Sequence, residues 1–173
     1  MKKILAVLLL IACVLSLAAC ANTDQTPDGM QNVALESAKY NLYVSKNWIP
    51  AAYNVSGAKA HTADNAPNIL ATVYYAEEQV TPTTYWENYC VPEYQAVFAN
   101  FTVLESEVAE TLGGKDAKAY KFSYTFGSST YQCYQVITVY EFNVYVLTYT
   151  AIATEYDSFF ADMEAAVYYF AFK

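Results

Sequence analysis

The sequence predicts an α+β fold with a central antiparallel sheet. Three strand patterns follow one another between residues 117 and 151 with only short turns between them, as in an antiparallel meander. Two other segments repeat apolar residues at helical spacing, one before this run and one at the C-terminal end. Together these patterns indicate helices packed on an antiparallel sheet.

The first residues have the order of an export signal. Lys2 and Lys3 give a positive start, and Ile4 to Ala18 then run almost without polarity. A membrane-spanning helix needs about 20 apolar residues, and this tract ends sooner, at the small-residue pattern Leu17-Ala18-Ala19-Cys20. We therefore expect residues 1–19 to be a signal peptide cleaved before Cys20.

Leu17 to Cys20 resembles a lipobox, the motif at which bacterial lipoproteins receive lipid on cysteine. The resemblance implies lipid attachment at Cys20 and an extracytoplasmic protein anchored to the cell membrane, or to the outer membrane if the host has one. Two or more acyl chains hold a protein stably, because each buried methylene contributes about 0.8 kcal/mol. The alternatives are an ordinary secretory signal, in which Cys20 has no special role, and an uncleaved anchor.

Residues 20–35 contain few apolar side chains and predict a tether, and residues 36–173 have the length of a single domain. After residue 19 the chain has seven lysines, no arginine and seventeen acidic residues, a formal charge of −10. This charge opposes binding to nucleic acid. Arginine is the side chain that usually binds phosphate groups through two hydrogen bonds, so its absence disfavours a nucleotide or phosphoester ligand.

The first half of the domain predicts short strands. Tyr40 to Val44 alternates apolar residues, a second strand is expected at Ala51 to Val55, and Ile69 to Tyr75 has the composition of a central strand. Between them, His61 to Asn68 predicts a loop.

A helix is expected to begin at Thr81-Pro82, an N-cap followed by proline in the first turn. Its apolar face is Trp86, Cys90, Tyr94, Val97 and Phe101. Pro92 predicts a kink or a two-piece helix with a break near Cys90 and Val91.

A strand is expected from Val103 to Ala109, and Leu112 to Lys115, which contains two glycines, predicts a turn. The meander strands are then Ala117 to Phe126, Thr130 to Tyr140 and Val144 to Ala151, with Phe142-Asn143 joining the last two. A final amphipathic helix runs from Glu155 to Tyr168, with an apolar face at Phe159, Met163, Ala166, Val167 and Phe170.

This order of elements resembles the PsbP-like family. The segments that carry the resemblance are Tyr40 to Trp48, "LGGKDAKAYKFSYTF" from Leu112, "YVLTYTA" from Tyr145, and Phe159 to Phe172. The resemblance covers about residues 36–173 and implies an α/β/α sandwich around an antiparallel sheet. It implies no catalytic residues, since the matching segments are core and turn patterns.

Few residues indicate chemistry. His61, the one histidine, lacks the partners of a zinc site or catalytic triad and predicts a surface residue, and no cofactor-binding pattern occurs. Glu77 and Glu78 would point to opposite sides of a strand, whereas Glu105 and Glu107 would share a solvated face near Glu110. These acids predict a charged surface rather than a metal site.

Cys90 and Cys133 are the cysteines left in the domain once Cys13 is removed with the signal and Cys20 carries lipid. They are a candidate disulfide pair between helix and sheet. Two separate buried thiols explain them equally well.

The leading functional hypothesis is a non-enzymatic binding or accessory domain for a protein or envelope component. The first alternative is binding of a small ligand or carbohydrate through exposed Tyr and Trp rings, with Trp48, Trp86 and Tyr85 as candidates. The second is a hydrolase that uses two carboxylates held a fixed distance apart in a cleft.

Overall fold

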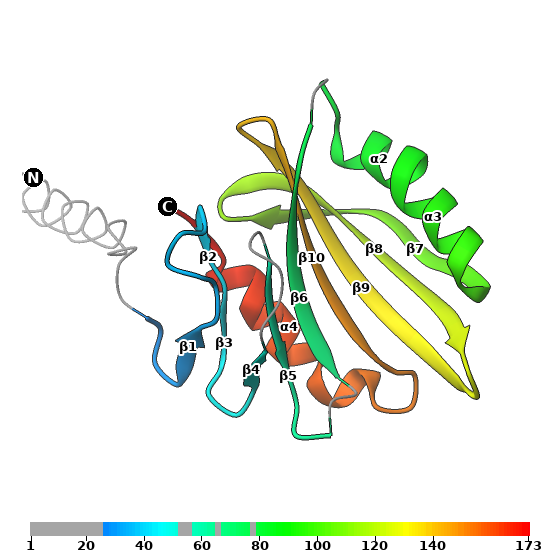
Figure 1. Ribbon diagram of the computed structural model, residues 1–173, viewed down its shortest axis with the longest axis horizontal. Helices are drawn as coiled ribbons and strands as arrows, with labels where there is room; N and C mark the ends of the chain where they lie inside the picture. The colour runs from blue at the N-terminus through cyan, green and yellow to red at the C-terminus, as the bar shows by residue number, and fades with distance from the viewer. Residues whose placement is uncertain (1–25, 52–56, 65–66, 77–78) are drawn as a thin grey trace, which may run out of the picture.

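The computed structural model describes residues 26–51, 57–64, 67–76 and 79–173, and it contains one large antiparallel sheet between two helical layers (Figure 1). The sheet order is β4-β5-β6-β10-β9-β8-β7. Its strands are β4 (Ile49–Ala51), β5 (Ala58–His61), β6 (Asn68–Tyr75), β7 (Ala99–Leu112), β8 (Lys115–Phe126), β9 (Ser129–Tyr140) and β10 (Asn143–Ile152). The predicted antiparallel meander is confirmed as β8-β9-β10, and the predicted central strand is β6, between β5 and β10.

Tight turns fix the register of the long strands. Gly113 and Gly114 join β7 to β8 with φ of +59° and +72°, the left-handed conformation that glycine adopts at little cost. The turn between β9 and β10 is made by Glu141 and Phe142, with φ of +48° and +59°. It lies one residue before the predicted Phe142-Asn143, because Asn143 already pairs with Tyr140 as the first residue of β10.

The predicted interrupted helix is confirmed. It consists of α2 (Pro82–Tyr85), a π-helical turn η1 (Trp86–Cys90) and α3 (Val91–Val97). At its start the Thr81 hydroxyl accepts from the Thr84 backbone N–H at 3.1 Å, while Thr84 Oγ1 accepts from the Thr81 N–H at 2.9 Å. The last two pieces, η1 and α3, meet between Cys90 and Val91, next to Pro92, which has no N–H to continue the hydrogen-bond ladder.

The end of this helix was predicted wrongly. Phe98 has extended backbone (φ −107°, ψ 131°), so the helix ends at Val97. Phe101 therefore lies on β7, and Val97 is 66% exposed rather than part of the buried face.

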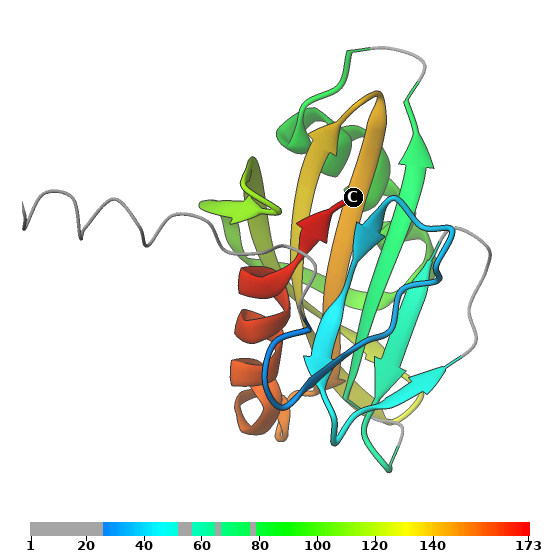
Figure 2. The same cartoon turned by 90° about the vertical axis from the view of Figure 1, so that its left-hand side faces the viewer.

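The two faces of the sheet carry different layers (Figures 1 and 2). The α2–η1–α3 segment covers one face around Trp86, Tyr120 and Phe122. The other face packs against α4 (Tyr156–Tyr169), which confirms the predicted C-terminal helix. Beside α4 lie β1 (Met30–Asn32), β2 (Tyr40–Asn41), β3 (Tyr43–Ser45) and β11 (Ala171–Phe172), in which β1 pairs with β3 and β11 with β2.

The N-terminal boundary of the folded domain needs correction. Residues 30–32, within the predicted tether of residues 20–35, form β1 on β3, and Met30 is buried. Gln31 Nε2 donates to the Trp48 carbonyl at 2.7 Å. A strand of three residues is too short to be predicted from a sequence pattern. Pairing with β3 stabilises it instead.

The loop predicted from His61 to Asn68 is shorter than expected, because His61 ends β5 and Asn68 begins β6. The strand β5 escaped prediction, since its Ala-Lys-Ala-His sequence has low β propensity and depends on pairing with β4 and β6. Of the strand expected at Ala51 to Val55, only Ala51 belongs to the described residues, where it ends β4. Within the described ranges, no helix has both the length and the apolarity to cross a membrane.

Candidate functional site

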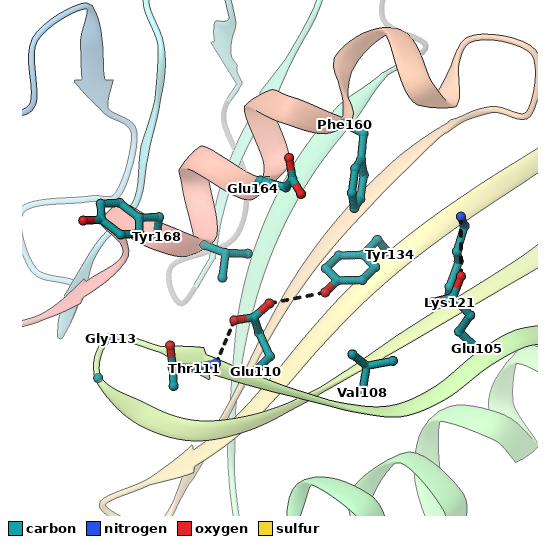
Figure 3. Close-up of a pocket in the computed structure, with 12 residues that line it drawn as sticks. Glu105, Val108, Glu110, Thr111, Gly113, Lys121, Tyr134, Phe160, Glu164 and Tyr168 are labelled. Carbon is teal, nitrogen blue, oxygen red and sulfur yellow. Dashed lines mark hydrogen bonds and ion pairs between the residues drawn. The ribbon is translucent and has the colours of Figure 1, made fainter.

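A cleft of about 530 Å³ lies between α4 and the β7-β8 end of the sheet, here called the acidic cleft (Figure 3). The strands contribute Glu105, Glu110, Lys121 and Tyr134, while α4 contributes Glu164 and two aromatic rings. Those rings, Phe160 and Tyr168, lie one helical turn to either side of Glu164, so one stripe of α4 faces the strands.

Each carboxylate of the acidic cleft has a different environment. Glu110 accepts the Thr111 backbone N–H at 2.9 Å and the Tyr134 hydroxyl at 3.4 Å. Glu105 forms an ion pair with Lys121 at 3.8 Å. The Glu164 carboxylate makes no hydrogen bond or ion pair to any other described residue. Three carboxylates thus face one ammonium group.

Tyr134 stays a neutral hydrogen-bond donor in this setting. Burial, and secondarily the Glu110 carboxylate, raises the pKa of Tyr134 to about 12. Its ring contacts Phe160 edge-on at 5.2 Å. The cleft therefore combines negative charge with aromatic walls.

The predicted common face of Glu105 and Glu107 is wrong. The β7-β8 register shifts between Glu105 and Val108, and Glu107 has φ of +57°, which identifies a β-bulge. Glu105 stays opposite Lys121 on the α4 face, whereas Glu107 turns to the face of Tyr120. Burial is the main cause of the raised pKa of Tyr120, and the negative charge of Glu107 adds to it. The bulge leaves Glu105 and Glu110 together in the cleft.

These carboxylates are grouped in a concavity, as a hydrolase would require, but their contacts favour another use. Glu110 is already engaged by a backbone and a hydroxyl donor, and Glu105 by the Lys121 ammonium, which leaves Glu164 as the carboxylate without such a partner among the described residues. The arrangement suits binding of a cationic group.

The aromatic candidates from the sequence lie in different environments. Trp48 is buried and donates its indole N–H to Asp162 at 2.9 Å, and Trp86 is buried in a stack on Tyr120 at 4.2 Å. Neither ring is free to bind a sugar. Tyr85 is half-buried beside the exposed rings of Tyr74 and Tyr89, at 6.0 and 5.2 Å.

Cys90 and Cys133 are free thiols, both buried, and they line the same cavity between α3 and the sheet. Of the two explanations that the sequence left open, the structure contains the separate thiols. Burial raises the pKa of Cys90 to about 11 and that of Cys133 to about 12, so both are protonated and weakly nucleophilic at neutral pH.

The remaining candidates form no site. His61, predicted in a surface loop, is a half-buried strand residue with Nδ1 2.7 Å from the Thr62 carbonyl oxygen. No group of three or more His, Cys, Asp or Glu side chains among the described residues is arranged to hold a metal ion. Glu77 and Glu78 lie outside those residues.

Sequence reasoning missed Glu164 and Gln135. Phe160, Glu164 and Tyr168 recur at intervals of four, a stripe that could have marked a second face of the final helix. Gln135 stands between Cys133 and Ile137 at an inward strand position, where a polar residue is unusual.

Comparison of the sequence with models of known protein families and with curated proteins finds no match. Solved structures do resemble this fold. The solution structure of cyanobacterial PsbP from Synechocystis matches with a TM-score of 0.63 and 10% identity, over 91% of this chain and 99% of that one. LpqN of Mycobacterium tuberculosis, described as involved in cell envelope biogenesis, matches with a TM-score of 0.59 and 17% identity, over 76% and 82%.

A Pseudomonas aeruginosa protein of unknown function matches with a TM-score of 0.53 and 14% identity, over 79% of this chain and 92% of that one. At these identities the likeness concerns the fold. The fold is PsbP-like, an α/β/α sandwich around an antiparallel sheet, as the sequence resemblance implied.

Proposed function

We propose that this chain is a non-enzymatic, extracytoplasmic accessory lipoprotein, anchored through lipid on Cys20, whose acidic cleft binds a cationic segment of a protein or envelope component. The acidic cleft is the observation that carries the proposal. The order of charged, apolar and small residues before Cys20 supports export and anchoring. The likeness to LpqN, whose description concerns cell envelope biogenesis, agrees with an envelope role.

The cleft has the two features that recognise an ammonium or guanidinium group. Glu164 offers a carboxylate without a competing partner among the described residues, and Glu105 is held only by an ion pair at 3.8 Å. Tyr134, Phe160 and Tyr168 supply ring faces, each worth about 0.5–1 kcal/mol toward a cation at an exposed site. The negative charge of the domain would also speed the approach of a basic partner.

The anchor is tested by replacing Cys20. A Cys20→Ala variant should lose its membrane association on cell fractionation, because no acyl chain can be attached. Cys13→Ala, which changes a cysteine inside the apolar tract, should still fractionate with membrane. Membrane association of the Cys20→Ala variant would refute lipid anchoring.

Partner binding is tested by photo-crosslinking in living cells. A photoreactive residue in place of Tyr168, which is 80% exposed at the cleft, should capture a partner through a Lys- or Arg-rich segment. The same residue in place of Tyr75, 73% exposed on β6 and outside the cleft, should not.

A charge-matched pair of variants separates the cleft from overall charge. Glu105→Gln with Glu164→Gln should reduce capture about tenfold, whereas Glu87→Gln with Asp157→Asn removes as much charge from exposed positions outside the cleft and should leave capture unchanged. Equal capture from Tyr168 and Tyr75, or equal loss in both double variants, would contradict the proposal.

A further inference from the structure

A second cavity, of about 170 Å³, lies on the opposite face of the sheet, between α3 and strands β6, β8, β9 and β10. We call it the neutral cavity. Its aromatic walls include Tyr94 stacked on Phe122 at 5.1 Å and Phe98 stacked on Tyr124 at 3.9 Å. Hydroxyl groups line the sheet side, from Thr72, Thr148 and Thr150.

Gln135 is the polar group that a closely packed core does not explain. It is 0% exposed, and its side-chain oxygen accepts the Tyr94 hydroxyl at 2.8 Å. Its amide nitrogen donates only to Cys90 Sγ at 3.5 Å, among the described residues. Sulfur is a weak acceptor and a primary amide carries two N–H groups. The Gln135 amide, in the wall of the cavity, therefore has N–H groups that donate to no oxygen among the described residues.

The walls of the neutral cavity carry almost no charge. Glu93 is the one charged residue among the described residues that line it. Burial raises the pKa of both cysteine thiols and of the Tyr94 and Tyr124 hydroxyls, so all four are protonated at neutral pH. An anionic ligand would lose its hydration without gaining a counter-charge, which is costly.

A second concavity borders this cavity. A neighbouring concavity of about 460 Å³ shares Tyr74 and Tyr85 with it and adds the rings of Tyr75 and Tyr89. Tyr74, Tyr75 and Tyr89 are 48%, 73% and 56% exposed. Apolar ring faces with polar tips thus surround this concavity.

We propose that the neutral cavity binds an uncharged, partly apolar small molecule that presents an oxygen acceptor to the Gln135 amide and a ring or alkyl part to Tyr94, Phe98 and Tyr124. The site shares no lining residue with the acidic cleft, so it stands or falls independently of the proposed function. A concavity of this size suits a fragment rather than a drug-sized ligand.

The test uses three probes of nearly equal shape: benzamide, benzoate and benzylammonium. The full chain is reconstituted in phosphatidylcholine nanodiscs, and binding is followed by ligand-observed NMR with empty nanodiscs as the blank. Benzamide should bind about tenfold more tightly than benzoate, because the anion meets no counter-charge in the cavity. It should also bind more tightly than benzylammonium, whose ammonium group cannot accept a hydrogen bond from the Gln135 amide.

Variants then assign the site. Gln135→Leu should weaken benzamide binding about 3- to 10-fold, the effect of one hydrogen bond. Gln95→Leu, the same change at an exposed position of α3, should leave it unaltered. Thr72→Phe should abolish binding by filling the cavity while leaving Gln135 in place, and it decides the matter if Gln135→Leu does not fold.

Three results would overturn the proposal: no benzamide binding to the unsubstituted chain, benzoate binding as tight as benzamide, or undiminished binding in Thr72→Phe. None of these variants changes the acidic cleft. Crosslinking through Tyr168 therefore remains an independent measurement.

Discussion

The two faces of the sheet are packed in opposite ways, although the same strands build both. Toward α4, Leu147, Tyr149 and Met163 are fully buried in one large cluster that also includes the N-terminal strands. Toward α2–η1–α3, the smaller cluster around Trp86 borders a cavity and half-buried rings. The comparison indicates that the α4 face contributes more of the stability, while the other face leaves room for the neutral cavity within its packing.

Strand β8 shows one physical origin of this difference. Its alternation places Ala117 and Ala119 toward the α4 cluster and Tyr120 and Phe122 toward the helical segment. Small residues allow close packing, whereas large rings hold the opposite layer away from the strand backbone.

The largest expected effect comes from neighbouring residues of β10 that point to opposite faces. Leu147→Ala should lower the free energy of unfolding by about 3–5 kcal/mol, because the α4 face cannot collapse around the missing carbons. Val146→Ala, on the face that borders the neutral cavity, should cost about 1–2 kcal/mol. Urea unfolding measures both. Equal losses would contradict the contrast between the faces.

Substitutions in the turn between β7 and β8 should show the next largest effect on stability. A Cβ at Gly113 would lie 2.6 Å from the Phe172 ring, and φ is +59°. Gly113→Ala should therefore destabilise by about 2–4 kcal/mol, from backbone strain and overpacking together. Gly114→Ala, with φ of +72° and no atom within 4 Å of the added carbon, should cost only about 1–2 kcal/mol. Thermal unfolding of the two variants tests this difference.

Alkaline pH should lower the stability of the folded protein through the two buried thiols that line the neutral cavity. Burial raises the pKa of Cys90 and Cys133 from 9.0 to about 11 and 12, so above pH 9 the unfolded chain releases protons that the folded chain retains. The free energy of unfolding is thus unaffected by these groups below pH 9 and falls above it, by up to about 1.4 kcal/mol per pH unit for each thiol.

The measurement is urea unfolding at pH 8, 9 and 10. The double variant Cys90→Ala/Cys133→Ala should lose stability less steeply above pH 9, since only the tyrosines then contribute. An unchanged slope in this variant would show that the thiols do not retain their protons through burial.

The smallest effect is expected at the ion pair of the acidic cleft. Lys121 and Glu105 have side-chain exposures of 25% and 56%, and exposed pairs contribute little. Lys121→Ala should change the free energy of unfolding by less than about 1 kcal/mol, close to the effect of Lys46→Ala at an exposed site. In the crosslinking assay, removal of this cation should increase capture of a basic partner. A loss of several kcal/mol would make the pair structural instead.

Local signals account for the parts of the fold that the sequence predicted. Composition predicted β6, alternation predicted β8, and short turns separated β9 and β10 from it. Helical spacing predicted α4, and Pro92 predicted the break at Cys90 and Val91. The strands β1, β5 and β11, which escaped prediction, are short and depend on their neighbours for stabilisation. The bulge at Glu107 also escaped, because a single left-handed residue reversed the predicted face without altering the sequence pattern.

The candidate sites were less predictable than the fold. The sequence selected Trp48 and Trp86 for their chemistry, but both became core residues because their positions face packed layers. Conversely, Glu164 and Gln135 have no motif around them. Their roles depend on which segments the fold brings opposite them.

The sequence by itself determined the alternation of the long strands, the capped and broken helix and the glycine turn, since each arises from interactions among residues a few positions apart. The prediction of lipid at Cys20 also rests on the sequence alone, because the motif consists of neighbouring residues. Only the tertiary structure decided that Glu105 and Glu110 of β7 face Glu164 of α4, and that Gln135 lies beneath Tyr94 of α3. Those meetings depend on sheet register and layer packing, which act between residues far apart in the chain.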